Sequence, residues 1–300
     1  MKKAIMITVA LLTIGTAAFA WALPSILHGL GLHPDYTGAS VKLPGKRALI
    51  ITTSHGVLNA PGETTGRPTG VFASEMTVPY YDFTEAGMSV DIASIQGGPI
   101  PIDPQSFYYM TRSPEDKRFQ QDEPVQAKVR RSLKIDDVDF TQYDLIFISG
   151  GWGAAYDLGT SKVLGEKLAQ AYRADRQPII GSVCHGALGL INARDQQGGL
   201  LIAGRRMTAV TNKQLSELDI DFTPQHPETE LRKAQVRFES KTAFRDIFAT
   251  HVVTDDERRF VTGQNQNSGH VTAHTMMSLL ADRMPQGPAG ANTSAVVGTK

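Results

Sequence analysis

Residues 178–190, PIIGSVCHGALGL, contain the change of pattern on which the interpretation of the whole chain depends. The apolar run 178–183 predicts a buried strand, and the residues from 185 to 193 predict a helix. Cys184 lies at the junction. A strand that turns sharply into a helix is the geometry of a nucleophile elbow, which presents one side chain at the carboxyl end of a sheet. We therefore expect Cys184 to be a reactive nucleophile, with His185 as the adjacent base.

Cys184 is the only cysteine in the 300 residues, so it cannot form a disulfide within the chain. A thiol at a helix N-terminus faces unpaired N–H groups and the positive end of the helix dipole, which favour the thiolate. This position predicts a pKa below the ordinary thiol value of about 8.5. The alternative is a buried cysteine that behaves as a small apolar side chain.

Short apolar runs alternate with amphipathic runs on both sides of this junction. Strands are predicted at 47–52, 90–94, 145–149 and 178–183, and helices at 71–86, 161–173 and 185–193. The later part of the chain predicts strands at 206–210 and around Val252 and Phe260, with helices at 227–234 and 270–281. Because strands that alternate with helices form parallel sheets, the sequence predicts an α/β fold, a flavodoxin-like parallel-sheet sandwich with helices on both faces.

Composition divides the chain into one main domain, 46–283, and flanking segments. A polar, charge-dense insertion at about 104–139 is long enough for two short helices, which we expect to form a small cap over one edge of the sheet. Residues 24–45, rich in Gly, Pro and His, predict a tether. The tail 284–300, rich in Pro, Gly, Ala, Ser and Thr, predicts disorder.

The N-terminal segment 1–23 carries a targeting pattern. Lys2 and Lys3 precede an apolar run, 4–23, that contains no charge. Such a segment is either a cleaved signal peptide or a retained membrane anchor, and the sequence leaves both open. Both alternatives predict an exported domain, periplasmic or anchored to the membrane and facing outward.

The charge balance limits the classes of partner. Thirty basic and thirty acidic residues cancel, so no overall field attracts nucleic acid. A small-molecule substrate fits this composition better.

Separated motifs give the chain a family resemblance. They are GVFASE at 70–75, DIAS at 91–94, SGGWGAAYDL at 149–158, SVCHG at 182–186 and FVTGQN at 260–265. Together they resemble the ThiJ/PfpI superfamily, which is class I glutamine-amidotransferase-like, over most of residues 47–282. Within it, the chain is most similar to the branch that contains stress-inducible chaperones and glutathione-independent glyoxalases, known as glyoxalase III.

The resemblance implies a cysteine-dependent enzyme that converts small reactive carbonyls such as methylglyoxal to lactate, with no cofactor and no metal. It implies Glu75 as the carboxylic acid that faces Cys184, and His185 as base or proton carrier. A carboxyl close to a thiolate in a partly desolvated pocket should keep its proton. Members of the family often dimerise, so a homodimer is a further expectation.

Three neighbouring residues complete the expected pocket. Gly150 and Gly151 permit a turn whose N–H groups, with that of His185, would form an oxyanion hole. Trp152 stands where the glyoxalase branch usually has histidine, so we expect an indole wall that narrows the substrate range. The residue that orients the catalytic histidine is expected in the segment that follows the next strand, where Asn212, Gln214 and Glu217 remain alternatives.

Other functions and one further site stay open on sequence alone. The same thiol would serve an amidase or peptidase-like hydrolase, or a holdase chaperone or oxidation sensor without turnover. His270 and His274 have the spacing of two metal ligands on a helix. The sequence near them shows no acidic third ligand, so we expect surface residues and no metal site.

Overall fold

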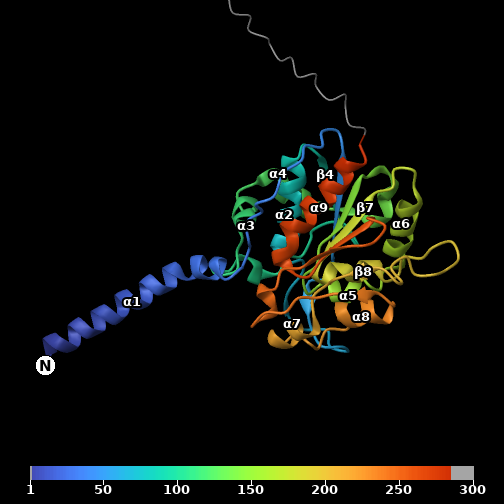
Figure 1. Ribbon diagram of the computed structural model, residues 1–300. Helices are drawn as coiled ribbons and strands as arrows, with labels where there is room; N and C mark the ends of the chain where they lie inside the picture. Colours follow the sequence, from blue (N-terminus) through green and yellow to red (C-terminus); the bar gives the residue numbers. More distant parts are fainter. Residues whose placement is uncertain (1, 285–300) are drawn as a thin grey trace, which may run out of the picture.

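Seven strands form one sheet in the order β10-β11-β7-β6-β1-β4-β5 in the computed structural model, which describes residues 2–284 (Figure 1). The strands are β1 (Arg47–Thr52), β4 (Ser89–Ser94), β5 (Leu133–Lys134), β6 (Leu145–Ile148), β7 (Ile179–Val183), β10 (Val252–Thr254) and β11 (Phe260–Gly263). All neighbouring pairs are parallel except β10 and β11, which are antiparallel. The predicted α/β parallel sheet is therefore confirmed, with one antiparallel edge strand added.

The central strand β1 shows why both faces of the sheet are covered. Successive side chains of a strand point to opposite faces. Ala48 and Ile50 contribute to one apolar cluster, whereas Leu49 and Ile51 contribute to another. All four side chains are fully buried, as expected for a parallel sheet between two layers of helices.

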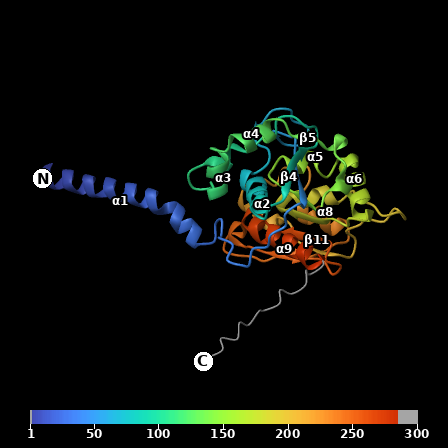
Figure 2. The same ribbon diagram turned by 90° about the horizontal axis from the view of Figure 1, so that it is seen from above.

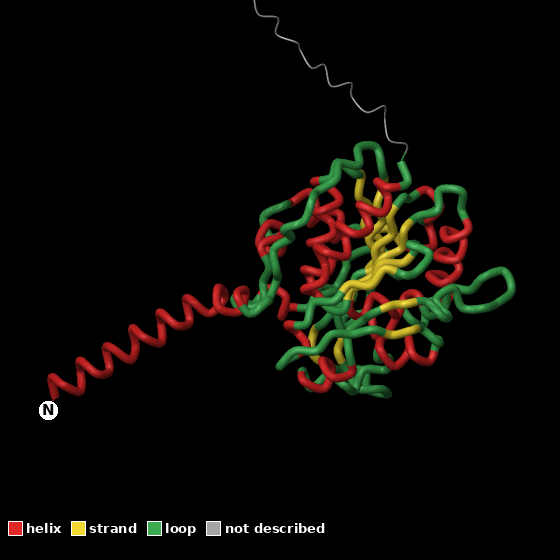
Figure 3. The backbone as a smooth tube through the Cα atoms, in the orientation of Figure 1, coloured by secondary structure: helices red, strands yellow, loops and turns green. Residues whose placement is uncertain are grey.

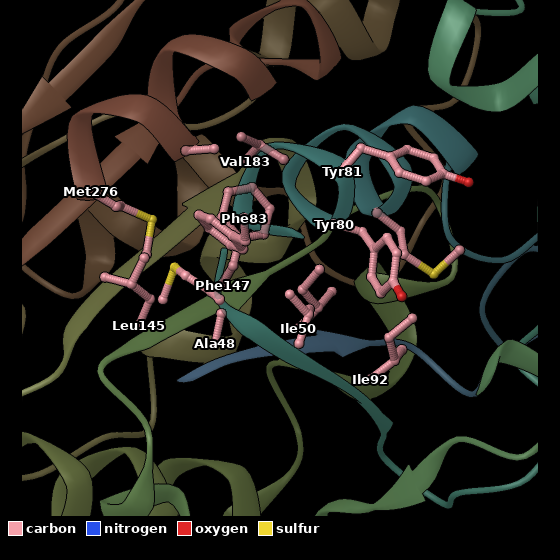
Figure 4. Close-up of a cluster of buried hydrophobic side chains, with 14 of the residues drawn as sticks. Ala48, Ile50, Tyr80, Tyr81, Phe83, Ile92, Leu145, Phe147, Val183 and Met276 are labelled. Carbon is pink, nitrogen blue, oxygen red and sulfur yellow. The ribbon is translucent and has the colours of Figure 1, made fainter. Parts of the chain in front are cut away.

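Different helices cover the two faces. On the first face lie α2 (Ala73–Glu85) and α9 (Gly269–Asp282), where the rings of Phe83 and Phe147 meet edge to face with centroids 6.1 Å apart (Figure 4). On the second face lie α5 (Ala154–Asp157), α6 (Lys162–Arg173) and α8 (Pro227–Lys233), and Figure 2 shows α2 and α6 on opposite sides. The sheet is thus enclosed, and its carboxyl edge remains available for a site.

The insertion contains the two predicted helices, α3 (Pro114–Phe119) and α4 (Glu123–Arg130). It also contains β5, which pairs with β4 at the edge of the sheet and was not predicted. A strand of two residues is too short to show an alternating pattern. Two small strand pairs were not predicted for the same reason: β2 (Val57–Leu58) with β3 (Arg67–Pro68), and β8 (Arg206–Met207) with β9 (Arg237–Phe238). Of these four strands, only β8 falls in a predicted strand.

At the N-terminus, α1 (Lys2–Gly29) projects away from the domain in Figures 1 and 3. The predicted tether differs from the structure, because α1 runs through Pro24 and the following residues pack on the domain. Leu32 and Leu43 are buried, and the backbone N–H of His33 donates to Asn267 Oδ1 at 2.8 Å. The predicted disordered tail lies outside the described residues from 285 onward.

Candidate active site

Cys184 directly follows β7 and has a left-handed backbone, with φ of 54°. A residue with a side chain pays about 1–3 kcal/mol for a sparsely populated conformation of this kind, which is common at functional sites. A Cβ at the nearby Gly186 would lie 2.1 Å from the carbonyl oxygen of Ile148, so the tight turn requires glycine there. The predicted elbow is confirmed. The predicted helix at 185–193 is not an α-helix, because the chain continues as a 3₁₀ helix, Cys184–Leu190.

Glu75, in the first turn of α2, lies beside the thiol as the resemblance implied. Its side chain is buried, and Oε2 accepts a hydrogen bond from the Gly150 N–H at 2.9 Å. The carboxyl also shares a hydrogen bond with Cys184. Burial raises the pKa of Glu75 to about 8, although both hydrogen bonds lower it. Glu75 therefore carries a proton at neutral pH and can donate it towards sulfur.

The pKa of Cys184 contradicts the expectation of an acidic thiol. Burial raises this pKa well above its ordinary value, and a charged Glu75 raises it further. The N–H groups of His185 and Gly151, which hydrogen-bond to the sulfur, lower it, but burial prevails. The short 3₁₀ segment does not offset the loss of hydration. The resting group is thus a thiol, and its proton must leave during the reaction.

His185 is the nearest base. Its Nδ1 lies 3.4 Å from Cys184 Sγ, and burial lowers the pKa of the imidazole to about 3, with a smaller contribution from His226. The imidazole is therefore neutral and able to accept a proton. Its Nε2 is buried without a hydrogen-bond partner among the described residues.

The three candidates for an orienting residue all lie on α7 (Asn212–Glu217), and in the described part of the chain none of them hydrogen-bonds to His185. Asn212 donates its N–H to Glu228 Oε2 on the surface, and Glu217 Oε2 accepts from the Asp246 N–H. Gln214 alone reaches the cavity beside the thiol. Within residues 2–284, the site thus combines Cys184, His185 and Glu75 without a third acid behind the imidazole.

The glycine pair serves two different purposes. The N–H of Gly150 is directed to Glu75, so its predicted role as an oxyanion donor is not supported. A Cβ on Gly150 would lie 2.6 Å from both Glu75 Oε2 and the backbone nitrogen of His185. Gly151, with φ of 97°, directs its N–H towards Cys184 Sγ, as His185 does. Gly151 and His185 are therefore the two donors placed to stabilise an oxyanion.

A cavity of about 290 Å³ opens above these groups. Trp152 forms part of its wall as predicted, with the indole edge to face against His185 at a centroid distance of 5.1 Å. Sequence reasoning missed several lining residues that come from loops and element ends: Arg67, Gln105, Thr111, Leu218, Ile220, Ile247 and Gln266. They carry no spacing signal, because segments far apart in the chain bring them together.

Comparisons with known proteins agree with this geometry. Residues 68–270 match the DJ-1/PfpI family. The chain is 24% identical over 249 residues to the glutathione-independent glyoxalase hsp3102 of Schizosaccharomyces pombe, covering 79% of this chain and 98% of that protein. It is 28% identical over 169 residues to glyoxalase 3 of Candida albicans, covering 55% of this chain and 69% of that protein.

Solved structures show the same fold. The 24-kDa rapid encystment protein of Francisella tularensis superimposes with a TM-score of 0.70 at 29% identity, covering 78% of this chain and 99% of that one. Glyoxalase III of Candida albicans superimposes with a TM-score of 0.66 at 24% identity, covering 78% and 97% of the two chains. The family match, the elbow and the sheet order lead to one assignment, and the chain belongs to the DJ-1/PfpI family.

Proposed function

We propose that the protein is a glutathione-independent glyoxalase that converts 2-oxoaldehydes such as methylglyoxal to 2-hydroxy acids. The observation that carries the proposal is the contact of Cys184 with both a protonated Glu75 and a neutral His185 at the base of one cavity. Relatives named as glyoxalases support it. The reaction needs a nucleophile, a proton acceptor and a group that stabilises sulfur, and these three residues supply them.

In the first step, Cys184 Sγ bonds to the aldehyde carbon, C1. The thiol proton passes to His185 and then to the former carbonyl oxygen, which gives a hemithioacetal. While negative charge develops on sulfur, the proton of Glu75 stabilises it through their shared hydrogen bond. The N–H groups of Gly151 and His185 stabilise charge on the oxygen.

In the second step, His185 removes the proton from C1, and the electron pair of that bond forms a double bond to C2, which gives an enediolate with its negative charge on the C2 oxygen. His185 returns the same proton to C2 while the proton of the C1 hydroxyl passes to the C2 oxygen, so that C1 becomes a thioester carbonyl and C2 an alcohol. Water then cleaves the thioester, which releases the hydroxy acid and restores the thiol. C1 is oxidised as C2 is reduced, so no external oxidant is required.

Measurement of lactate formed from methylglyoxal without glutathione tests the proposal. A hydrolase would instead cleave amide or ester substrates and leave methylglyoxal unchanged. The relatives named as glyoxalases favour lactate formation over that alternative. An oxidation sensor would consume one equivalent of peroxide per thiol and form no lactate.

Trp152→His is expected to raise the turnover of methylglyoxal by about 10-fold to 10²-fold, because it places a proton-carrying ring where an inert indole now contacts His185. Steady-state kinetics check this. The matched control is Trp152→Phe, which keeps an aromatic wall without proton chemistry and should leave kcat near the wild-type value. Equal kcat and KM in all three proteins would make Trp152 a packing residue.

We also propose that α1 directs the domain out of the cytoplasm, as signal peptide or anchor. Its segment Ile5–Gly29 has a mean hydropathy of 2.0, is long enough to span a bilayer, and contains an apolar window of 18 residues of which none is buried. A fusion of residues 1–45 to alkaline phosphatase is expected to be active, because that enzyme requires an oxidising compartment. Replacing Leu11 and Leu12 with Lys in the same fusion should abolish activity. An inactive wild-type fusion would contradict export.

A further inference from the structure

A second group of ionisable side chains lies between α2 and α9, away from the thiol. Asp82 follows Glu75 by seven residues on this helix, which is about 10 Å along the axis. Helix α9 packs against α2 (Figure 1). Its His270 and His274 lie within contact distance of Asp82. The expectation that these two histidines are surface residues without an acidic neighbour is therefore wrong. The acid comes from a helix distant in sequence, which spacing alone could not reveal.

The three side chains converge closely. One oxygen, Asp82 Oδ1, lies 3.1 Å from His270 Nδ1 and 3.5 Å from His274 Nε2. One ligand atom from each residue lies within 4.8 Å of the other two. Tetrahedral zinc with bonds of about 2.0–2.1 Å needs ligand atoms about 3.3 Å apart. Both distances to Asp82 match that requirement, and small rotations of the rings would complete it.

His274 has an environment that its own protein contacts do not explain. The side chain is 11% exposed, yet its Nδ1 has no hydrogen-bond partner within the described residues. Its Nε2 makes only the 3.5 Å contact with Asp82. Tyr36 stacks on the ring with centroids 3.7 Å apart and so fixes its plane. The nitrogen that bears on a metal site is Nε2, which faces Asp82 in a fixed plane without a short hydrogen bond of its own.

We propose that Asp82, His270 and His274 bind a divalent transition-metal ion, with zinc as the expected occupant. Two imidazoles and one carboxylate are a ligand set that zinc and related metals favour, and they leave further positions for water. The site is partly accessible, since the side chain of His270 is 22% exposed. It is separate from the proposed glyoxalase chemistry and does not depend on it.

Glu115 of α3 lies behind His270, on the side of the ring that faces away from Asp82. Its Oε1 lies 3.7 Å from His270 Nε2, the ring nitrogen that faces away from Asp82. Histidines that bind metals usually donate their second ring N–H to such a carboxylate, which orients the ring. The metal would thereby join α2, α9 and the insertion that carries α3. Glu115 acts as a positioning residue and not as a ligand.

The competing explanation is an ion pair that needs no metal. Although burial lowers it, the carboxylates of Asp82 and Glu115 raise the pKa of His270 to about 10. His270 and His274 would then both donate to Asp82. This explanation leaves the long 3.5 Å contact of His274 Nε2 unaccounted for, and it predicts no specific zinc binding.

Zinc binding to the full chain, stripped with a chelator, separates the two explanations. All proteins carry Cys184→Ser, so that the thiol cannot bind the metal. Competition with a chromophoric chelator is expected to show one zinc per chain. His274→Gln and Asp82→Asn should each weaken binding at least about 100-fold, and Glu115→Gln by about 10-fold to 100-fold. Substitution with cobalt should give a visible absorption band that His274→Gln removes.

His251→Gln is the matched control, because His251 also lies near one carboxylate, with its Nε2 3.9 Å from Glu239, but has no second histidine there among the described residues. It should bind zinc like the parent. Far-UV circular dichroism checks the folding of each variant. If Asp82→Asn misfolds, the zinc affinity of Glu115→Gln still distinguishes the two explanations, because this variant keeps all three ligands. No zinc in the parent, or equal affinity in every variant, would overturn the proposal.

Discussion

Cys184→Ser is expected to lower the rate of lactate formation from methylglyoxal by at least about 10³-fold, in line with the loss of a nucleophile in other covalent enzymes. Serine fits the same turn and keeps a polar atom beside Glu75 and His185. A hydroxyl is a much weaker nucleophile than a thiol and holds its proton more tightly, so the same neutral His185 activates it far less. The measurement is kcat with methylglyoxal, with thermal denaturation as a check on folding.

Ser182→Ala is the matched control for this substitution. Ser182 precedes Cys184 by two residues in β7, and its hydroxyl is buried without a hydrogen-bond partner among the described residues. Loss of that hydroxyl should leave kcat within about twofold and stability unchanged or slightly higher. If Cys184→Ser keeps more than about a tenth of the wild-type rate, the thiol is not the nucleophile and the proposed mechanism fails.

Much of the fold follows from local pattern. The predicted strand 47–52 coincides with β1, and the predicted helices 161–173 and 227–234 agree with α6 and α8 within a residue or two. The strand is a continuous apolar run, and the two helices place their apolar residues on one face, so the local sequence specifies all three. The antiparallel direction of β10 also has a local cause, because only residues 255–259 separate it from β11, too few for the crossover that a parallel pair needs.

The sequence predicted which three side chains meet but not their electrostatics. Cys184, His185 and Glu75 lie in recognisable motifs, and the structure brings them together. The pKa of the thiol was predicted in the wrong direction. The prediction considered the helix terminus, which lowers the pKa, and not the burial of Cys184 together with Glu75, which raises it. Burial depends on what covers the elbow, and those residues are distant in sequence. The contact of Asp82 with His270 and His274 could not be predicted for the same reason, because the two helices are distant in sequence.

Glu75→Gln is expected to change how stability depends on pH. The carboxyl has a pKa of about 8 in the folded protein, against an ordinary value of 4.5 for the free side chain. Between these values the folded state holds one more proton than the unfolded state, so the wild-type free energy of unfolding falls as pH rises. The glutamine side chain of the variant cannot ionise, and its amide can still accept from Gly150 and donate to sulfur. From about pH 5 to pH 8 the variant should therefore gain on the order of 3–4 kcal/mol relative to wild type.

Urea denaturation of both proteins at several pH values measures this difference, in which the titration of all other groups cancels. Glu85→Gln is the control, since Glu85 lies on the same helix but its side chain is 61% exposed, paired with Arg118 on the surface. Its stability curve should run parallel to that of wild type. If the Glu75→Gln curve also runs parallel, Glu75 titrates near its ordinary pKa. It would then be charged beside Cys184 at neutral pH, and the step in which its proton stabilises the sulfur would have to be abandoned.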